Sequence, residues 1–129
     1  MILVVDRSLR DGNTVAGIFA YMGLLAHAVR PQDVPGEISH RYRSVMLPRP
    51  DSIIDLPVFI SRFRSFAGGI PIFALHPSPK NFAYSALFDG VFDEGSLSST
   101  VLDGMRSFCK THELPAPGNY RLCGIDASV

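Results

Sequence analysis

The sequence predicts an α/β fold, a five-stranded parallel sheet with helices on both faces. First, the run Ile2-Leu3-Val4-Val5 is apolar throughout, which is typical of a central strand covered on both sides. Second, strand-like and helix-like segments alternate five times with short connections, which favours parallel strands. Third, 129 residues with 47% hydrophobic and 19% charged residues suit one globular domain and exclude a disordered chain.

A helix is expected after the first strand, because apolar side chains recur there at helical spacing. They are Val15, Ile18, Phe19 and Met22. Residues 11–13 are expected to form the turn before this helix. Asn13 or Thr14 is expected to cap this helix, and Gly23 stands where it would end. Residues 25–29 predict a second strand. The prolines that follow allow only a short or broken helix up to about Ser39.

The middle of the chain repeats this alternation. Residues 43–47 predict a third strand, which prolines end. Residues 53–66 predict a helix whose regular part starts near Asp55, since a proline belongs in the first turn, and which glycines 68–69 end. The expected core contacts of this helix are Ile54, Val58, Ile60 and Phe63. Residues 70–75 predict the fourth strand.

The last part of the pattern is less regular. Residues 81–88 predict a short helix, residues 90–92 a weak fifth strand, and residues 96–110 a final helix. The apolar face of that final helix holds Val101, Leu102, Met105 and Phe108. We expect one domain over residues 1–110. Residues 111–129 are expected to be a proline-containing linker and the start of a truncated C-terminal domain.

Charge and composition exclude several functions. Lys+Arg and Asp+Glu both total 12, which argues against non-specific nucleic-acid binding by the domain. The two cysteines, Cys109 and Cys123, lack metal-type spacing and fit a reducing cytoplasm. The most apolar stretch, residues 15–29, is too short to span a membrane and contains His27. No basic segment precedes the first apolar run, so a signal peptide is not expected.

The carboxyl ends of the predicted strands carry polar residues, and ligand chemistry gathers at such ends in parallel sheets. These are Asp6-Arg7, Pro48-Arg49, His76-Pro77 and Asp93-Glu94. Four segments, ILVVDR, YRSVMLP, IPIFALHP and DGVFDEG, follow the order of the predicted strands. On these segments, residues 1–110 resemble a response-regulator receiver domain. The resemblance implies a doubly wound sheet with strand order 2-1-3-4-5.

The site that the resemblance implies departs from the family pattern. In receiver domains, acids after the first strand hold Mg²⁺, and an Asp at the end of the third strand accepts the phosphoryl group. Here Asp6 matches the first acid, Arg7 stands in place of the second, and Pro48 falls where the acceptor belongs. Because proline has no nucleophile and one Asp beside an Arg is a poor Mg²⁺ site, we do not expect a phosphoryl switch.

Three further positions depart from the family. His76 falls where a hydroxyl is expected, Glu94 replaces a lysine and inverts its charge, and Val91 replaces an aromatic residue. We therefore expect no catalytic residue, no phospho-acceptor, no metal site and no cofactor. Asp51 is the next acid after the third strand. It is an alternative acceptor if the chain folds it back beside Asp6.

The tail adds a second resemblance. Residues 118–126 resemble the opening of the DNA-binding domain in winged-helix transcriptional response regulators. This implies that residues 1–110 supply dimerisation and signal input, and that DNA is contacted only through an absent C-terminal domain. The implied homodimer pairs through the fourth helix, fifth strand and last helix, residues 79–110. The residues expected on that face are Tyr84, Phe88, Val91 and Arg106. About half of the apolar side chains in this segment must belong to the core, so only the others can form the interface.

Alternative interpretations of these residues are open. Asp6 is either a remnant metal ligand or a structural carboxylate, helix-capping or buried, that pairs with Arg7 or a neighbour. The structural interpretation is favoured. Arg7 and Arg49 form either an anion site or surface ion pairs with Asp93 or Glu94. His76 is either a loop histidine, or a pH switch or phosphoryl acceptor. The alternative function is a pseudo-receiver that binds a small anion or a partner protein. An enzyme is not favoured, because no glycine loop follows the first strand and no nucleophile–base pair stands out.

Overall fold

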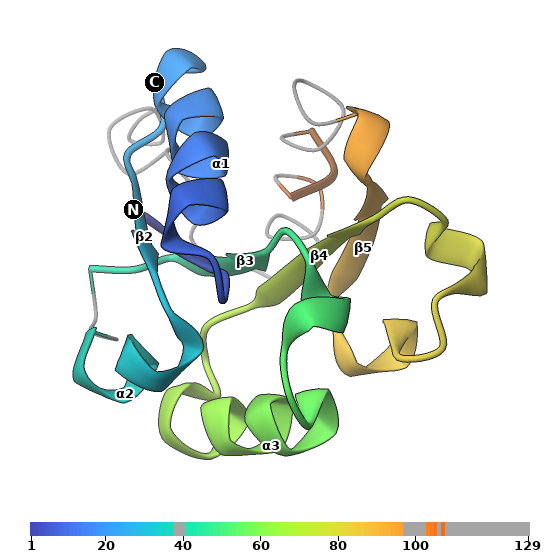
Figure 1. The fold of residues 1–129 in the computed structure, drawn as a ribbon. Helices are drawn as coiled ribbons and strands as arrows, with labels where there is room; N and C mark the ends of the chain where they lie inside the picture. The colour runs from blue at the N-terminus through green and yellow to red at the C-terminus, as the bar shows by residue number, and fades with distance from the viewer. Residues whose placement is uncertain (38–40, 97–102, 106, 108–129) are drawn as a thin grey trace.

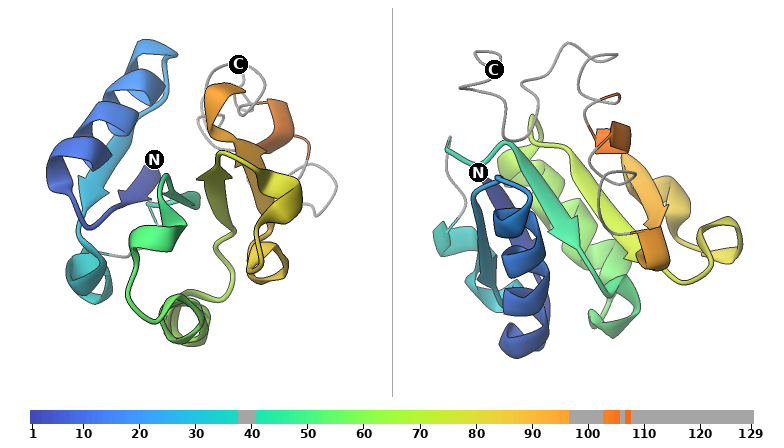
Figure 2. Two further views of the ribbon diagram at one scale, coloured as in Figure 1. Left: turned by 45° about the vertical axis from the view of Figure 1, so that its right-hand side comes forward. Right: turned by 90° about the horizontal axis from the view of Figure 1, so that it is seen from above.

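The computed structural model describes residues 1–37, 41–96, 103–105 and 107. Five strands form one parallel sheet in the order β2-β1-β3-β4-β5, which confirms the expected sheet and strand order (Figure 1). The strands are β1 (Ile2–Val5), β2 (Ala26–Val29), β3 (Ser44–Leu47), β4 (Ile72–His76) and β5 (Gly90–Asp93). Because all five run the same way, their carboxyl ends meet at one edge of the sheet (Figure 2).

The interior strand β1 is buried along its whole length, and its side chains alternate between two apolar clusters. Ile2 and Val4 share a cluster with Phe19 of helix α1 (Leu9–Tyr21). The other two side chains of β1 share a second cluster with Phe63 of helix α3 (Leu56–Ala67). Among the described residues, only α1, α3 and the four-residue α2 (Val34–Glu37) are α-helices with defined bounds, so the full doubly wound set of helices is not shown.

Helix α1 starts five residues before the expected Thr14, so the prediction of its cap is wrong. Ser8 is the cap, and its Oγ accepts a hydrogen bond of 3.2 Å from the Asp11 backbone N–H. Gly12 belongs to the helix and not to a turn. It packs closely against β2, where a Cβ on Gly12 would lie 3.3 Å from the Cβ of Ala28. The helix thus begins directly after β1. Its end agrees with expectation, because Gly23 follows with a φ of 86°.

The two ends of helix α3 agree with the prediction, but the side chains that it buries differ in part from the expected ones. It begins after Asp55 and ends before Gly68. Its buried side chains are Leu56, Ile60, Phe63 and Ala67. Ile54 and Val58 are 71% and 51% exposed, so their expected core role is wrong. Ile54 precedes the helix, and the helical period that buries Leu56 and Ile60 turns Val58 to the outside.

The prediction of a helix over residues 81–88 is wrong. The chain forms two 3-10 turns there, η3 (Pro79–Asn81) and η4 (Ser85–Leu87). Phe82 and Phe88 are both buried, with ring centroids 5.9 Å apart. Residues six apart on an α-helix point about 240° apart around its axis, so one regular helix cannot bury both rings on one side. The extended Phe82, with ψ 114°, breaks the helix instead.

Elsewhere the pattern is partly confirmed. The broken helix after β2 is the 3-10 turn η1 (Pro31–Asp33) followed by α2. Two more 3-10 turns, η2 (Pro50–Ser52) and η5 (Glu94–Ser96), follow β3 and β5. Residues 103–105 are helical, with Met105 buried. Several expected residues lie outside the described part: Val101, Leu102, Arg106, Phe108, Cys109, Cys123 and the tail 111–129. Within the described residues, no helix has the length and apolar character needed to cross a bilayer.

Candidate functional site at the carboxyl edge of the sheet

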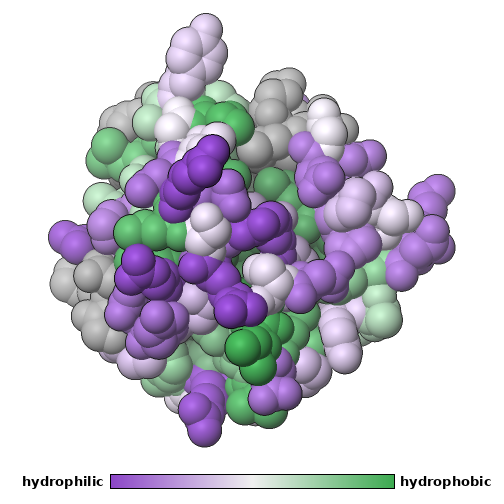
Figure 3. Space-filling model, in the orientation of Figure 1, coloured by the Kyte–Doolittle hydropathy of each residue, from purple (hydrophilic) through white to green (hydrophobic). Residues whose placement is uncertain are grey.

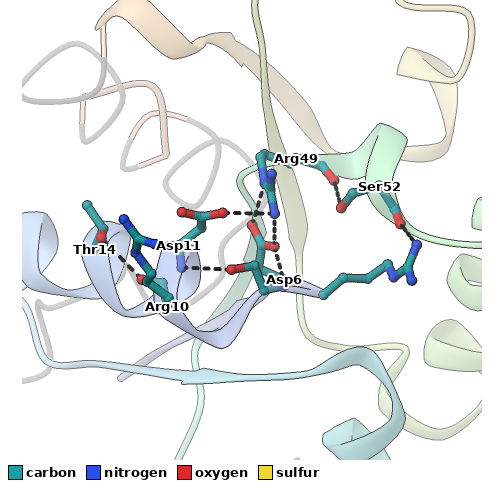
Figure 4. A network of polar contacts seen from close by, with 8 residues as sticks. Asp6, Arg10, Asp11, Thr14, Arg49 and Ser52 are labelled. Atoms are coloured by element: carbon teal, nitrogen blue, oxygen red, sulfur yellow. Dashed lines mark hydrogen bonds and ion pairs between the residues drawn. The ribbon is translucent and has the colours of Figure 1, made fainter.

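Asp6 is the buried carboxylate at the carboxyl end of β1. Its Oδ1 accepts hydrogen bonds of 2.8 Å from the Ser8 backbone N–H and 2.8 Å from Arg49 Nη2. Its Oδ2 accepts a third, of 3.2 Å, from Arg49 Nε. The side chain of Asp6 is 0% exposed, and this two-point guanidinium contact supplies the charge that a buried carboxylate needs (Figure 4).

Arg49 holds a second carboxylate as well. Its Nη2 lies 3.1 Å from Oδ2 of Asp11, in the first turn of α1 (Figure 4). The hydrogen bond with Asp6 and the charge of both carboxylates raise the pKa of the Arg49 guanidinium above its ordinary value. Pro48 and Pro50 on either side of Arg49 are buried, which fixes the backbone from which the side chain reaches. Arg49 thus joins the ends of β1 and β3 to α1.

This arrangement does not fit a divalent cation. Mg²⁺ needs carboxylate oxygens that are open to it. Both oxygens of Asp6 are engaged, and the guanidinium lies between Asp6 and Asp11, where such a cation would have to bind. In the part of the chain that the structure describes, no group of three His, Cys, Asp or Glu side chains is placed to hold a metal ion.

His76 forms the second polar pair, at the carboxyl end of β4. Its Nε2 lies 3.0 Å from Oδ2 of Asp51 in η2, and its Nδ1 accepts a 3.0 Å hydrogen bond from the Ser78 backbone N–H. Because Nδ1 is an acceptor, the neutral ring carries its proton on Nε2 and donates it to Asp51. The ring also stacks on Phe82, with centroids 4.4 Å apart. Both ring nitrogens are therefore engaged.

The remaining expected site residues are less involved. Arg7 is exposed and donates a long 3.4 Å hydrogen bond to the Ser52 carbonyl. Glu94 is exposed at the start of η5, and Asp93 accepts from the Gly95 backbone N–H at 2.9 Å. The expected ion pairs of Arg7 and Arg49 with Asp93 or Glu94 are absent among the described residues, where Arg49 pairs with Asp6 and Asp11 instead.

The sheet edge brings only part of the expected set together. Pro48, His76 and Glu94 line one shallow groove of about 330 Å³ with Arg49, Asp51 and Ser52. Asp6 lies behind Arg49, and Arg7 lines a different groove. Asp11 was not expected at the site, because residues 11–13 were expected to form a turn. The signal that could have found Asp11 is Ser8, three positions earlier. Serine is a common helix cap, and a cap at Ser8 places Asp11 in the first turn of α1.

The expected dimer face is also divided. Tyr84 is 43% exposed, Phe88 is buried in the core, and Val91 is partly buried against the same cluster. Arg106 lies outside the described residues. Of the three described members, only Tyr84 offers a large exposed apolar surface.

Comparison of the chain with protein-family models, with curated proteins and with solved structures gave no match. The strand order and the residues at the carboxyl edge are therefore the observations on which a function has to be argued. A shared sheet topology alone says little about function, because such folds carry many activities. The contacts of Asp6 and Arg49 carry more weight.

Proposed function

We propose that this chain contains an atypical receiver-like domain that works without phosphorylation and gives dimerisation and signal input to a cytoplasmic transcriptional regulator. The observation that carries the proposal is the two-point contact of Arg49 with buried Asp6. A guanidinium stays protonated throughout the physiological pH range and cannot leave as a metal ion does. An edge closed in this way suits a domain whose conformation is set by partners and not by phosphoryl transfer.

Two further observations support this interpretation. The sheet has the strand order that the receiver resemblance implies. Pro48, buried directly after β3, has no side-chain oxygen that could accept a phosphoryl group, and the nearby Asp51 contacts His76. In this proposal, DNA is contacted by a separate domain. Residues 118–126 resemble the start of such a domain.

A binding module without a transcriptional role is the second candidate. In this candidate, the apolar groove of about 600 Å³ beside α3 is the surface on which an unrelated protein would bind. A small anion is less favoured, because the charge of Arg49 is already shared by two carboxylates. The two candidates differ in whether the ligand is a second copy or an unrelated protein.

The test is an amide NMR titration of the protein with Mg²⁺ and then with beryllofluoride, a mimic of the phosphoryl group. We expect no saturable shift at Asp6, Leu47 or Arg49, and sedimentation should give the same mass before and after. Saturable shifts around Asp6 and Asp51 with a change of mass would overturn the proposal, because a relocated acceptor would then exist.

The Arg49→Met variant is the matched control. It removes the guanidinium and leaves the carboxylates of Asp6 and Asp11 facing one another, so Mg²⁺ alone should now shift the amides around them. Circular dichroism verifies that the variant is folded. If Mg²⁺ shifts neither protein, closure by Arg49 is not what excludes the cation.

A further inference from the structure

Helix α3 has apolar side chains on two sides. One side is buried in the core, and the other is largely exposed. We call five residues, the Asp55 that directly precedes α3 and four residues of the helix, the outer face of α3. They are Asp55, Val58, Phe59, Arg62 and Phe66, which all line the groove of about 600 Å³ beside α3. Val58 and Phe66 are 51% and 45% exposed, and Phe59 is partly buried. A helix that is apolar on two sides usually has a partner on each.

The outer face is part of a wider apolar surface. Ile54, just before the helix, is 71% exposed and lines the same groove. Across the groove stand side chains of η1 and α2, among them Pro31, Val34 and Pro35. Figure 3 shows hydrophobic surface low on the molecule, where Figure 1 places α3, as well as elsewhere on this side. Contiguous exposed apolar surface of this kind marks an interaction site.

The charges on the outer face are arranged in a way that suits one kind of partner. It carries one negative residue, Asp55, and one positive residue, Arg62, seven positions apart with Val58 and Phe59 midway between them. Both charges are exposed, and within the described residues neither side chain has a hydrogen bond or an ion pair. Seven residues are about two turns, or roughly 10 Å along the helix.

We propose that this face pairs with the same face of a second copy, the two α3 helices lying antiparallel across a two-fold axis between Val58 and Phe59. The proposal rests on the dimerisation part of the proposed function and names its surface. A two-fold interface must be complementary to itself. The antiparallel arrangement places Asp55 of each copy opposite Arg62 of the other, so that both charges find partners.

The same axis also covers the apolar residues. The Val58 and Phe59 side chains of the two copies meet at the centre, where an interface is most apolar. Phe66 and Ile54 lie on opposite sides of the axis, so Phe66 of one copy and Ile54 of the other lie at the same end of the interface. The open groove beside α3 accepts side chains of the facing copy. A partner with a surface of one charge would leave Asp55 or Arg62 unmatched.

Sedimentation equilibrium over a concentration series tests the interface. The unchanged protein should be a dimer. Arg62→Glu places two negative charges against each other at both ends of the interface, and Asp55→Lys places two positive ones there. Each single change should raise the dimer dissociation constant at least about tenfold, because each contact occurs twice. The double variant Asp55→Lys/Arg62→Glu should restore dimerisation, since each copy then carries the reversed but complementary pair.

Three controls separate the interface from other effects. Val58→Glu should abolish the dimer, whereas Ser61→Glu, an exposed position of α3 outside the groove, should leave it intact. Tyr84→Arg tests the surface that the receiver resemblance implies. Thermal unfolding of each variant shows that loss of the dimer is not loss of the fold.

The outcomes distinguish this inference from the proposed function. A monomeric protein, or a dimer that Val58→Glu and Arg62→Glu leave unchanged, overturns the α3 interface. Loss of the dimer only in Tyr84→Arg moves the contact to residues 79–110. Neither result alters the beryllofluoride test, which depends on Asp6 and Arg49. Conversely, a response to beryllofluoride would overturn the proposed function while charge reversal still reports on α3.

Discussion

Two acid–base pairs stand at the carboxyl edge of the sheet, and burial is reversed between them. In the pair of Asp6 and Arg49 the carboxylate is 0% exposed and the base is 46% exposed. In the pair of Asp51 and His76 the carboxylate is 67% exposed and the base is 13% exposed. A buried carboxylate needs a permanent cation, whereas a buried imidazole can stay neutral. The first pair is therefore expected to hold the fold together, and the second to matter little.

The largest expected effect comes from Arg49→Met. The substitution leaves the buried Asp6 carboxylate with the Ser8 N–H as its remaining described hydrogen-bond donor. Breaking a buried ion pair from one side costs about 3 kcal/mol, so the free energy of unfolding should fall by that order. Urea unfolding followed by circular dichroism measures the change.

The double variant Asp6→Asn/Arg49→Met is the control for this effect. Asparagine is neutral and its carbonyl oxygen still accepts from Ser8, so the double variant should be more stable than Arg49→Met alone. A coupling free energy near zero would show that the two side chains act independently, and the contrast between the two pairs would then fail.

A third charged group, at the amino edge of the sheet, differs from both pairs, because a like charge acts on it. The Met1 ammonium lies near the positive charge of Arg43. The Met1 ammonium donates to the Arg41 carbonyl at 3.2 Å. Burial, and then the charge of Arg43, lowers the pKa of this amine from 8.0 to about 6. Between these two values the unfolded chain binds more protons than the folded one, so stability should rise with pH from about 6 to 8.

Because Met1 is only partly buried, this contribution should stay below about 1 kcal/mol. Acetylating the amine of Met1 removes the titrating group. The difference in urea midpoint between free and acetylated protein should therefore vary with pH over this window and level off outside it. A difference that is constant with pH would show that the amine titrates normally in the fold.

The sheet was predictable from the sequence because its signals are local. The apolar run of β1 and the two glycines after α3 identify their elements without any knowledge of neighbours. The start of α1 was missed because Gly12 was taken as a turn residue, although Ser8 is an ordinary cap. The turns around Phe82 were missed because the requirement to bury its ring comes from the completed sheet.

The location of the site was predictable, but its partners were not. All four residues of the two pairs were expected near a strand end at the carboxyl edge, whereas Asp11, which also contacts Arg49, was not. Asp6 and Arg49 are 43 positions apart, and Asp51 and His76 are 25 positions apart. Only the register of the parallel strands decides which acid meets which base. An expected contact of Arg49 with Asp93 or Glu94 was equally consistent with the sequence.

The smallest expected effect is that of Asp51→Asn. Asp51 is exposed, and in neutral His76 the Nε2–H needs only an oxygen, which asparagine also supplies. Exposed pairs contribute little, so the free energy of unfolding near pH 8 should change by no more than about 0.5 kcal/mol. Urea unfolding at low and high salt measures this, and the result should hardly depend on salt.

His76→Ala gives the reverse case within the same pair. It removes the buried member, the acceptor for the Ser78 N–H and the ring that stacks on Phe82, and should cost about 1 kcal/mol or more. If Asp51→Asn proved as costly as His76→Ala, the exposed carboxylate would be holding a charged imidazolium. The second pair would then be a true ion pair like the first, and exposure alone would not distinguish them.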